Sequence, residues 1–511
     1  MRNVLIGAAA IPLALGLLIP TNAHAIDDVN TKKLRTAVTV SGILQHERAL
    51  QRIANENDGT RASGTPGYDA SAAYVATKLR QAGYKVTLQG FTFPFFRVLQ
   101  PGVSAQLTPT PTEYETATLE YSGSGDVTGA IIPTTDVVIP PTPAPSSTSG
   151  CEPADFVPAP TAPAIALIQR GTCTLEQKVA NAEAAGYDAV LFFNEGQPGR
   201  TEIPAVTVGA PAGVPVNGLG FADGAALYAA TQAGPVTGRV SASVEIDLNR
   251  TTVNVLADSP KGKNAGETVI VGAHLDSVLE GPGINDNGSG SATILEIAEQ
   301  LADLGYTKNL RRQVRFAFWG AEENNLLGSQ HYVDNLTDAQ QAKIYANLNF
   351  DMLGSPNYVR FVYDGDGSDS EPAGPPGSDA IEQIFTDYFT GQGLASEPTP
   401  FSGRSDYGPF IAVGIPAGGL FSGAEGIKTA EQAATYGGTA DAPYDACYHQ
   451  ACDTINNLST NALFELGDAA AHSVLVLAAS KTGLYPDGSR VAQRSAKAAS
   501  APAPEGHTAI R

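Results

Sequence analysis

Short apolar runs alternate with helix-like segments from residue 250 to residue 482, and this alternation leaves few folds open to the chain. The runs are typical of buried strands: TTVNVLAD, ETVIVGAHLDS, QVRFAFWG, IYANLNFDML and IPAGGLFSG. Helices are predicted between or after them, at 289–304, 326–335, 378–391 and 460–480. Because strands that alternate with helices form a sheet covered by helices, the sequence predicts an α/β fold.

Five residues of the types that bind metals are spread along this part of the chain: His274, Asp286, Glu323, Asp351 and His449. Four of the five follow a predicted buried strand, so we expect them to meet at one edge of the sheet. Asp286 lies in the glycine-rich segment GINDNGSGS, where the backbone can bring a carboxylate close enough to bridge two cations ~3.5–4 Å apart. The set predicts a two-metal site that assists the attack of water on a carbonyl.

Each of these residues also has an ordinary structural explanation. His274 could be a core histidine, Asp286 could cap the following helix, and Asp351 could mark the exit of its strand to solvent. The metal hypothesis is favoured because the chain has only seven histidines, and His274 and His449 fall in matching acidic, glycine-rich surroundings. Asp276 lies two residues after His274, on the same side of an extended strand. It is predicted to hold the other imidazole nitrogen or to steady the loop.

Two adjacent carboxylates follow the strand VRFAFWG, at Glu322 and Glu323. Adjacent side chains point in different directions, so one can bind metal while the other faces the reacting water. We assign Glu323 to metal and predict that Glu322 accepts a proton from water and returns it to the leaving amine. The alternative is a solvated acidic pair at the start of a helix.

The segment CYHQACDT places His449 between Cys447 and Cys452. A disulfide between these two cysteines is predicted by their order along the chain, and it would hold the histidine rigidly. Tyr448 offers a phenol that could donate a hydrogen bond to a developing oxyanion, or it could simply pack. The cysteines lack Cys-x-x-Cys spacing, which argues against zinc held by thiolates.

The N-terminus predicts export. Residues 1–25 have the pattern of a signal peptide. Arg2 provides the positive end, Val4 to Ile19 form an apolar stretch, and the small residues Ala23 and Ala25 mark a cleavage site. The alternative is a retained anchor. No other segment reads as long and apolar enough to span a bilayer, so we expect a soluble, secreted protein. The net charge of -21 argues against nucleic acid or an anionic membrane surface as partner.

Composition divides the rest of the chain into four parts: 26–97, 98–245, 246–485 and 486–511. The first and third parts carry the helices and strands of the main domain. The second contains a stretch rich in Pro, Thr and Ser and then a strand–helix–strand unit without catalytic residues, which predicts a smaller inserted domain. Cys151 and Cys173 lie in it and are predicted to form a disulfide. The fourth part is predicted to be disordered or removed.

Together these motifs resemble peptidase family M28, a family of zinc exopeptidases. SGRSDYGPFIAVGIPAGGLFSG and CYHQACDT are similar to the secreted Streptomyces-type leucine aminopeptidases. The inserted part, with IALIQRGTCTLEQKVANAEAAGYDAVLFFNEG, resembles a protease-associated (PA) domain. The resemblance implies a mixed sheet sandwiched by helices and two Zn²⁺ per chain, one held by His274, Asp286 and Asp351 and the other by Asp286, Glu323 and His449.

The resemblance also implies roles for residues around the metals. Glu322 would be the general base. Tyr448 and Arg404 would hold the substrate and stabilise the tetrahedral intermediate, and Met352 and Phe421 would line the pocket for the first side chain. A Ca²⁺ site also occurs in this family, but the sequence does not place it here.

We therefore expect a secreted, monomeric di-zinc aminopeptidase that releases large apolar residues, such as Leu, from the N-termini of peptides and proteins. A first alternative is a carboxypeptidase or another di-metal amidohydrolase, for which Arg404 is the one candidate to hold a substrate carboxylate. A second is a non-catalytic binding protein on the same scaffold. A third is that the PA domain supplies the main function by docking protein partners.

Overall fold

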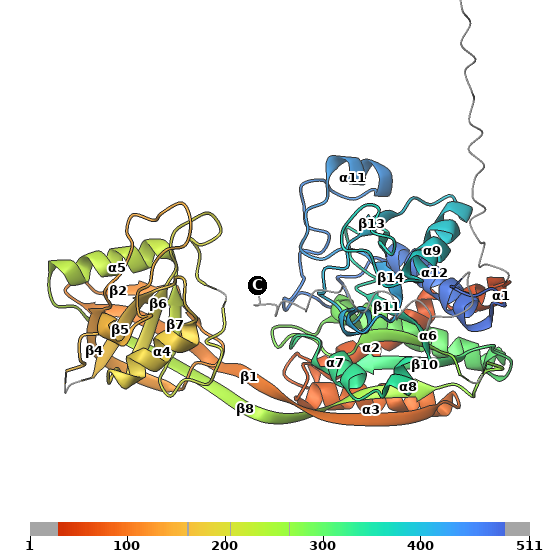
Figure 1. Cartoon of the computed structure of the whole chain (residues 1–511), viewed down its shortest axis with the longest axis horizontal. Coiled ribbons are helices and arrows are strands. Elements are labelled where there is room, and N and C mark those ends of the chain that lie inside the picture. The colour runs from red at the N-terminus through yellow and green to blue at the C-terminus, as the bar shows by residue number, and fades with distance from the viewer. Residues whose placement is uncertain (1–28, 161–162, 205, 265, 486–511) are drawn as a thin grey trace, which may run out of the picture.

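The computed structural model describes residues 29–160, 163–204, 206–264 and 266–485. The predicted signal peptide and C-terminal tail lie outside the described residues. Figure 1 shows two bodies, a larger one on the right and a smaller one on the left, joined by a two-stranded ribbon. One sheet of 14 strands passes through both bodies.

In the larger body the sheet is mixed, as predicted. Its strand order is β13 (Glu397–Thr399), β12 (Phe361–Tyr363), β14 (Ala417–Phe421), β11 (Ile344–Asp351), β9 (Thr268–His274), β10 (Gln313–Trp319) and β8 (Thr237–Asp258). Strands β14, β11, β9 and β10 are parallel, whereas β12 and β8 run antiparallel to their neighbours β14 and β10.

The four parallel strands place their carboxyl ends at one edge of the sheet. Trp319 at the end of β10 pairs with His274 at the end of β9, and Asp351 at the end of β11 pairs with Phe421 at the end of β14. Every residue of β11 is buried. Both faces of these strands are covered, which explains why they appear in the sequence as continuous apolar runs.

One face of the sheet is covered by helices that share the largest hydrophobic core: α1 (Lys32–Ala37), α2 (Val40–Asn55), α3 (Pro66–Gln81), α6 (Gly290–Asp303), α9 (Ser378–Gly391) and α12 (Thr460–Ala479). The predicted helix at 289–304 is α6. It buries Ile294, Ile297 and Leu301, and the chain turns away at Gly305, whose φ of 74° suits glycine. The helix predicted at 378–391 is α9.

The opposite face carries α7 (Leu327–Asp334), the predicted helix at 326–335, together with α10 (Gly408–Ala412). Trp319, Tyr332 and Phe410 pack there with ring centroids 5.2 to 6.0 Å apart. The short helix α8 (Asp338–Gln341) follows α7 in the chain. Helix α11 (Ala430–Tyr436) lies at the top of Figure 1, where Gln432 donates to Glu397 of the edge strand β13 at 2.7 Å.

The expectation that only the signal is apolar enough to span a bilayer was wrong. Helix α12 has 20 residues, and an 18-residue window within it has a mean hydropathy of 1.4, so it could span a membrane by length and composition. In the fold 78% of its apolar window is buried among the other elements of the larger body. Its hydrophobicity is thus explained by its place in the protein core.

A buried ion cluster joins α2, α3 and α6. The Nε2 of His46 on α2 lies 3.4 Å from Glu299 and 3.7 Å from Glu296, and Lys78 on α3 lies 2.9 Å from Glu299. The Nδ1 of His46 lies 2.8 Å from the Tyr74 hydroxyl. Burial lowers the pKa of His46, but its contacts with the two glutamates outweigh burial, and the pKa is raised above 6.5.

This cluster predicts a stability that depends on pH. Because the His46 pKa is higher in the folded protein, its stabilisation is complete below about pH 6.5 and is lost as the pH rises through the folded pKa. We expect His46→Gln to lower the free energy of unfolding by about 1–2 kcal/mol near pH 6 and by less at alkaline pH. Urea denaturation of both proteins at several pH values measures this difference, and an equal difference at every pH would contradict it.

The ribbon consists of β1 (Lys85–Thr108) and β8, which pair antiparallel from Lys85 and Asp258 to Thr108 and Thr237 with several bulges. Strand β10 pairs with β8 only between Val255 and Asp258. The rest of β8 therefore runs past the carboxyl end of β10 and leaves the larger body at that edge. The predicted domain boundaries at 97/98 and 245/246 fall inside these two strands.

The smaller body is built on β4 (Gly125–Pro133), β5 (Ala164–Gln169), β6 (Ala189–Phe193), β7 (Val216–Leu219) and β3 (Ala117–Thr118), while β2 (Thr112–Tyr114) pairs with β1. Helices α4 (Leu175–Ala184) and α5 (Phe221–Ala233) contribute to separate hydrophobic cores. The predicted strand–helix–strand unit is β5, α4 and β6. Both cores consist of residues of the smaller body alone, as expected of an inserted domain.

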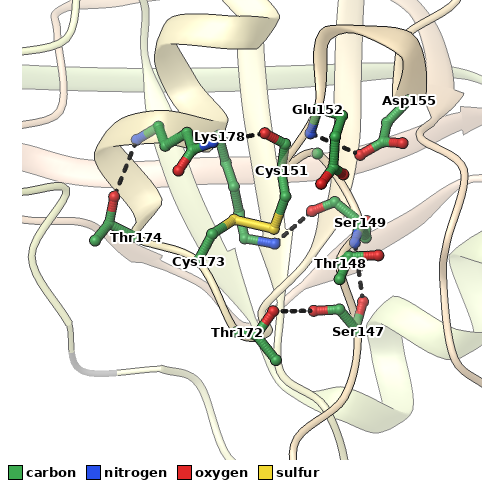
Figure 2. Close-up of a disulfide and its surroundings, with 12 residues drawn as sticks. Ser147, Thr148, Ser149, Cys151, Glu152, Asp155, Thr172, Cys173, Thr174 and Lys178 are labelled. Atoms are coloured by element: carbon green, nitrogen blue, oxygen red, sulfur yellow. Dashed lines mark hydrogen bonds between the residues drawn. A yellow bond between two sulfur atoms is a disulfide. The ribbon is translucent and has the colours of Figure 1, made fainter.

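The predicted Cys151–Cys173 disulfide is present in the smaller body, with a Cα–Cα distance of 5.9 Å. Figure 2 shows Lys178 of α4 reaching the carbonyl of Ser149 beside this disulfide. Its Nζ also donates to the carbonyl of Gln169, 3.1 Å away. Burial lowers the pKa of Lys178 to about 8. The buried ammonium therefore ties the end of β5 to the loop that precedes it.

Candidate metal centre

The five predicted ligands come together at the carboxyl edge of the parallel strands. His274 ends β9 and Asp351 ends β11. Glu323 follows β10, Asp286 lies in the turn before α6, and His449 lies in the loop between Cys447 and Cys452. The topology therefore brings together residues that are widely separated in the sequence.

Asp286 lies between the two histidines. Its Oδ1 is 3.2 Å from Nε2 of His274, and its Oδ2 is 3.1 Å from Nε2 of His449. On the first side Asp351 Oδ1 is 3.3 Å from the same His274 nitrogen. On the second side Glu323 Oε2 is 3.1 Å from the His449 nitrogen. The arrangement forms two adjoining groups of ligand atoms that share one carboxylate.

The atoms in these two groups are placed as ligands of cations would be. Asp351 Oδ1 and His449 Nε2 are buried and form no hydrogen bond with any residue that the structure describes, although partner atoms lie close by. Two ligands bound ~2.0–2.1 Å from one tetrahedral zinc ion lie roughly 3.3 Å apart, which matches the observed spacings of 3.1 to 3.3 Å. The donor set of imidazole and carboxylate suits zinc.

The charge of the site also suits cations. Four carboxylates lie around two imidazoles: Asp286, Glu322, Glu323 and Asp351. Burial lowers the pKa of His449, but Glu323 and Asp286 outweigh it and raise the pKa to about 10. This environment strongly favours positive charge at the imidazole, and two divalent cations would balance the four carboxylates.

Asp276 contacts the second imidazole nitrogen of His274 and also the loop of Glu322. Nδ1 of His274 lies 3.2 Å from the backbone carbonyl of Asp276 and 3.6 Å from its carboxylate. The carbonyl is thus the nearer partner, and it favours the tautomer that leaves Nε2 open toward Asp286 and Asp351. The carboxylate instead accepts the backbone N–H of Glu322 at 3.3 Å, so Asp276 steadies both loops.

Glu322 lies beside the first ligand group, with Oε2 3.8 Å from Nε2 of His274. It is buried and sits one residue before Glu323, as its predicted role requires. Burial raises the pKa of Glu322 well above its usual value, and His274 only partly opposes the shift. A carboxyl group with a raised pKa is suited to accept and release a proton near neutral pH.

Tyr448 and Arg404 meet at the mouth of the site. The Tyr448 ring stacks on His449 with centroids 3.8 Å apart, and Arg404 Nη2 donates to the Tyr448 hydroxyl at 3.2 Å. Arg404 is exposed and also pairs with Glu425 at 2.6 Å. Burial raises the pKa of Tyr448, which keeps the phenol protonated and able to donate a hydrogen bond.

The two residues proposed for the substrate pocket differ in exposure. Met352 directly follows Asp351 and is 2% exposed, with its backbone N–H donating to Asn287 Oδ1 at 3.1 Å. Phe421 ends β14, is partly exposed and stacks on Phe361 with centroids 6.0 Å apart. Phe421 is therefore the better placed of the two to contact a ligand.

Several supporting residues were not predicted. Ser405 donates to Asp351 Oδ2 at 2.5 Å and accepts from Asn349 at 2.8 Å, which fixes the orientation of the ligand. Asp453 accepts the backbone N–H groups of Asn285 and Asp286 at 2.8 and 3.0 Å. Ser405 follows Arg404, and Asp453 follows Cys452, so proximity to a motif was the only signal in the sequence.

The structure brings Asp364, Asp366 and Glu382 together in an acidic cluster. Asp364 Oδ2 accepts backbone N–H groups of residues 369 and 370 at 3.0 and 2.6 Å, and Glu382 Oε2 accepts that of residue 365 at 2.8 Å. These hydrogen bonds fix the loop after β12 and join it to α9.

Comparison with known proteins identifies the family of the chain. Residues 254–474 match the model of peptidase family M28, and residues 133–227 match the PA domain. An aminopeptidase of Pseudomonas aeruginosa (strain UCBPP-PA14) is 47% identical over 447 residues, which cover 86% of this chain and 81% of that protein. A probable leucine aminopeptidase 2 of Aspergillus fumigatus is 38% identical, covering 90% of this chain and 87% of the relative.

Solved structures agree with this assignment. A zinc aminopeptidase from Bacillus subtilis aligns with a TM-score of 0.62 and 25% identity, covering 88% of this chain and 97% of the other. An aminopeptidase from Aneurinibacillus sp. strain AM-1 has the same fold, with a TM-score of 0.65 and 24% identity over 89% of this chain and 98% of the other. The fold and the site thus define a metallopeptidase. The chain belongs to peptidase family M28 and is an aminopeptidase with an inserted PA domain.

Proposed function

We propose that the protein is a secreted di-zinc aminopeptidase that removes large apolar residues from peptide N-termini. The observation that carries this proposal is the position of Asp286 between His274 and His449, each with a second carboxylate beside it. Bound there, two zinc ions would activate a water molecule and polarise the carbonyl of the scissile bond.

Four residues of the chain would carry out the remaining chemistry. Glu322 accepts the proton of the attacking water and passes it to the nitrogen of the leaving peptide. Tyr448 donates a hydrogen bond to the oxygen of the tetrahedral intermediate, and Arg404 holds the phenol in position. Asp276 orients His274 through its carbonyl and the loop of Glu322 through its carboxylate.

The preference for an N-terminal residue is supported by the relatives, two of which are named aminopeptidases. The exposed Arg404 is already paired with Glu425, which weakens the alternative of a carboxypeptidase. The aromatic pair of Phe361 and Phe421 supports an apolar pocket for the first side chain, and the fungal relative is named for leucine.

Secretion is supported by the two disulfides and the signal-like N-terminus. A 41% identical relative from Mycobacterium tuberculosis is described as a probable lipoprotein aminopeptidase, so membrane attachment is the alternative for the N-terminal segment. Fractionation of the producing cells, with detection of the protein in medium and membranes, distinguishes the two.

The test of the proposed activity compares leucine p-nitroanilide with its N-acetylated form. We expect hydrolysis of the free-amine compound alone, its loss on treatment with a chelator, and its return when zinc is added. Peptides blocked at either end extend the comparison to the carboxypeptidase alternative. Failure to cleave any of these substrates with two zinc ions bound would overturn the proposal in favour of a binding protein.

A further inference from the structure

The loop of residues 320–328 presents both Glu322 and Glu323, and its backbone is unusual. Ala321, Asn325 and Leu326 all have positive φ angles, of 53°, 68° and 61°. Residues other than glycine rarely adopt this conformation, and it persists only where the surroundings impose it. Something outside the loop must therefore hold it in shape.

The two ends of this loop lie against each other and against Asn254 of β8. A Cβ atom added to Gly328 would lie 2.0 Å from the carbonyl oxygen of Gly320 and 2.5 Å from Asn254 Oδ1. A Cβ added to Gly320 would lie 2.4 Å from the Tyr68 hydroxyl. Positions 320 and 328 thus need glycine, because neighbouring atoms leave no room for a Cβ atom at either position.

Asn254 joins the two ends with its amide. Its Oδ1 accepts the backbone N–H of Gly320 at 3.1 Å, and its Nδ2 donates to the carbonyl of Gly328 at 2.8 Å. The same Nδ2 donates to Gln89 Oε1 on β1 at 3.1 Å. Asn254 is fully buried, and its amide provides the donor and the acceptor on two separate atoms.

The ribbon that carries the PA domain contacts the same loop. Phe91, Phe93 and Phe95 of β1 form a hydrophobic cluster with Ala321, which Leu327 joins. Asn254 and Gln89 belong to the same two strands, β8 and β1. The ribbon therefore holds the loop in two ways. Asn254 forms hydrogen bonds with the two ends of the loop, and the phenylalanines of β1 pack against Ala321 within it.

We propose that Asn254 is a positioning residue for the metal-binding Glu323 and the proton-transferring Glu322, which it controls by joining residues 320 and 328. The inference rests on the proposed two-metal function. It also assigns a second role to the ribbon, because the strands that connect the PA domain to the larger body are the strands that fix these carboxylates.

The test uses Asn254→Asp in the full-length protein. The new carboxylate keeps an acceptor for Gly320 but directs an oxygen at the Gly328 carbonyl, so the loop should open. Changes to residues that support metal ligands cost about 10–100-fold in affinity or activity. We expect kcat to fall by about 10–100-fold with KM within about threefold, since the substrate-binding residues Arg404 and Phe421 lie on other elements.

Metal binding supplies a readout that does not depend on activity. Metal-free protein is titrated with zinc in competition with a coloured chelator, which yields a dissociation constant for each site. For Asn254→Asp we expect one of the two sites, the one that includes Glu323, to weaken by about 10–100-fold, and the other to stay within about threefold.

Two controls separate positioning from general damage. Thr252 is a buried residue two positions before Asn254 on the same strand, and its hydroxyl forms no hydrogen bond within the described part of the chain. Thr252→Val should therefore leave both zinc dissociation constants unchanged. If Asn254→Asp does not fold, Asn254→Ser removes the double contact without burying a charge and should give the same selective loss.

Parent-like kcat and parent-like zinc constants in a folded Asn254 variant would overturn the proposal. Equal weakening of both zinc sites, with a lower melting temperature, would also overturn it, because it would indicate a purely structural role. Failure of the parent to cleave any peptide would refute the proposed function instead, and the zinc titration would still report on Asn254.

Discussion

Glu322→Gln is expected to lower kcat by about 10²–10⁴-fold while both zinc ions stay bound, because the amide cannot accept the proton of the attacking water. The substitution keeps the size of the side chain and leaves Glu323, His274 and Asp286 untouched. KM should change little, since Glu322 is assigned to proton transfer and not to substrate binding. Steady-state kinetics and zinc analysis of the purified protein measure both parts of this expectation.

Glu56→Gln provides a matched control for this substitution, because Glu56 is an exposed residue at the end of α2. The control should retain both metals and the activity of the parent. Loss of zinc together with activity in Glu322→Gln would show that this glutamate is a ligand. Retention of parent activity would assign the proton transfer to another group.

Asp286→Asn should affect both metals at once. Each oxygen of Asp286 faces a different histidine, so one substitution removes an anionic ligand from both groups of atoms. We expect both zinc affinities to fall by more than the roughly 100-fold limit seen for supporting residues, and hydrolysis to fall close to background. Zinc titration with a competing chelator and an assay at saturating zinc measure the two effects.

Asp351→Asn tests whether the effect of Asp286→Asn on both metals comes from a shared ligand or only from the loss of one negative charge. Of the two histidines Asp351 faces only His274, so its substitution should weaken one zinc site far more than the other. Asp303→Asn, at the exposed end of α6, carries the same change in charge and should alter neither. If Asp286→Asn also weakened a single site, the bridging role of Asp286 would be wrong.

The sequence predicted the part of the site that depends on strand ends. His274 and Asp351 each close an apolar run, and parallel strands with covered faces align such ends at one edge of a sheet. The helix at 289–304 was predictable because its apolar residues recur with helical spacing and a glycine follows. The disulfides were predictable from chain order because only four cysteines are present.

Other features depend on contacts between distant segments and left no local pattern. Asn254 contacts residues 320 and 328, and Asp453 contacts residues 285 and 286, yet each looks like an ordinary polar residue in the sequence. The carbonyl of Asp276, and not its carboxylate, is the nearer partner of His274, a choice set by backbone geometry. Helix α12 resembles a membrane span because a central core helix and a lipid-facing helix have similar composition.

The paired course of β1 and β8 makes the PA domain a separable module. Phe95 pairs with Asp247 and Phe96 with Ile246, so the chain enters and leaves the domain through neighbouring positions on two hydrogen-bonded strands. A two-residue turn can join such strands, because antiparallel partners lie about 5 Å apart. Joining Phe96 to Ile246 in this way would excise residues 97–245 while keeping the aromatic cluster and Asn254. The pair of Phe96 and Ile246 is thus a position at which the chain can be shortened to engineer a single-domain peptidase.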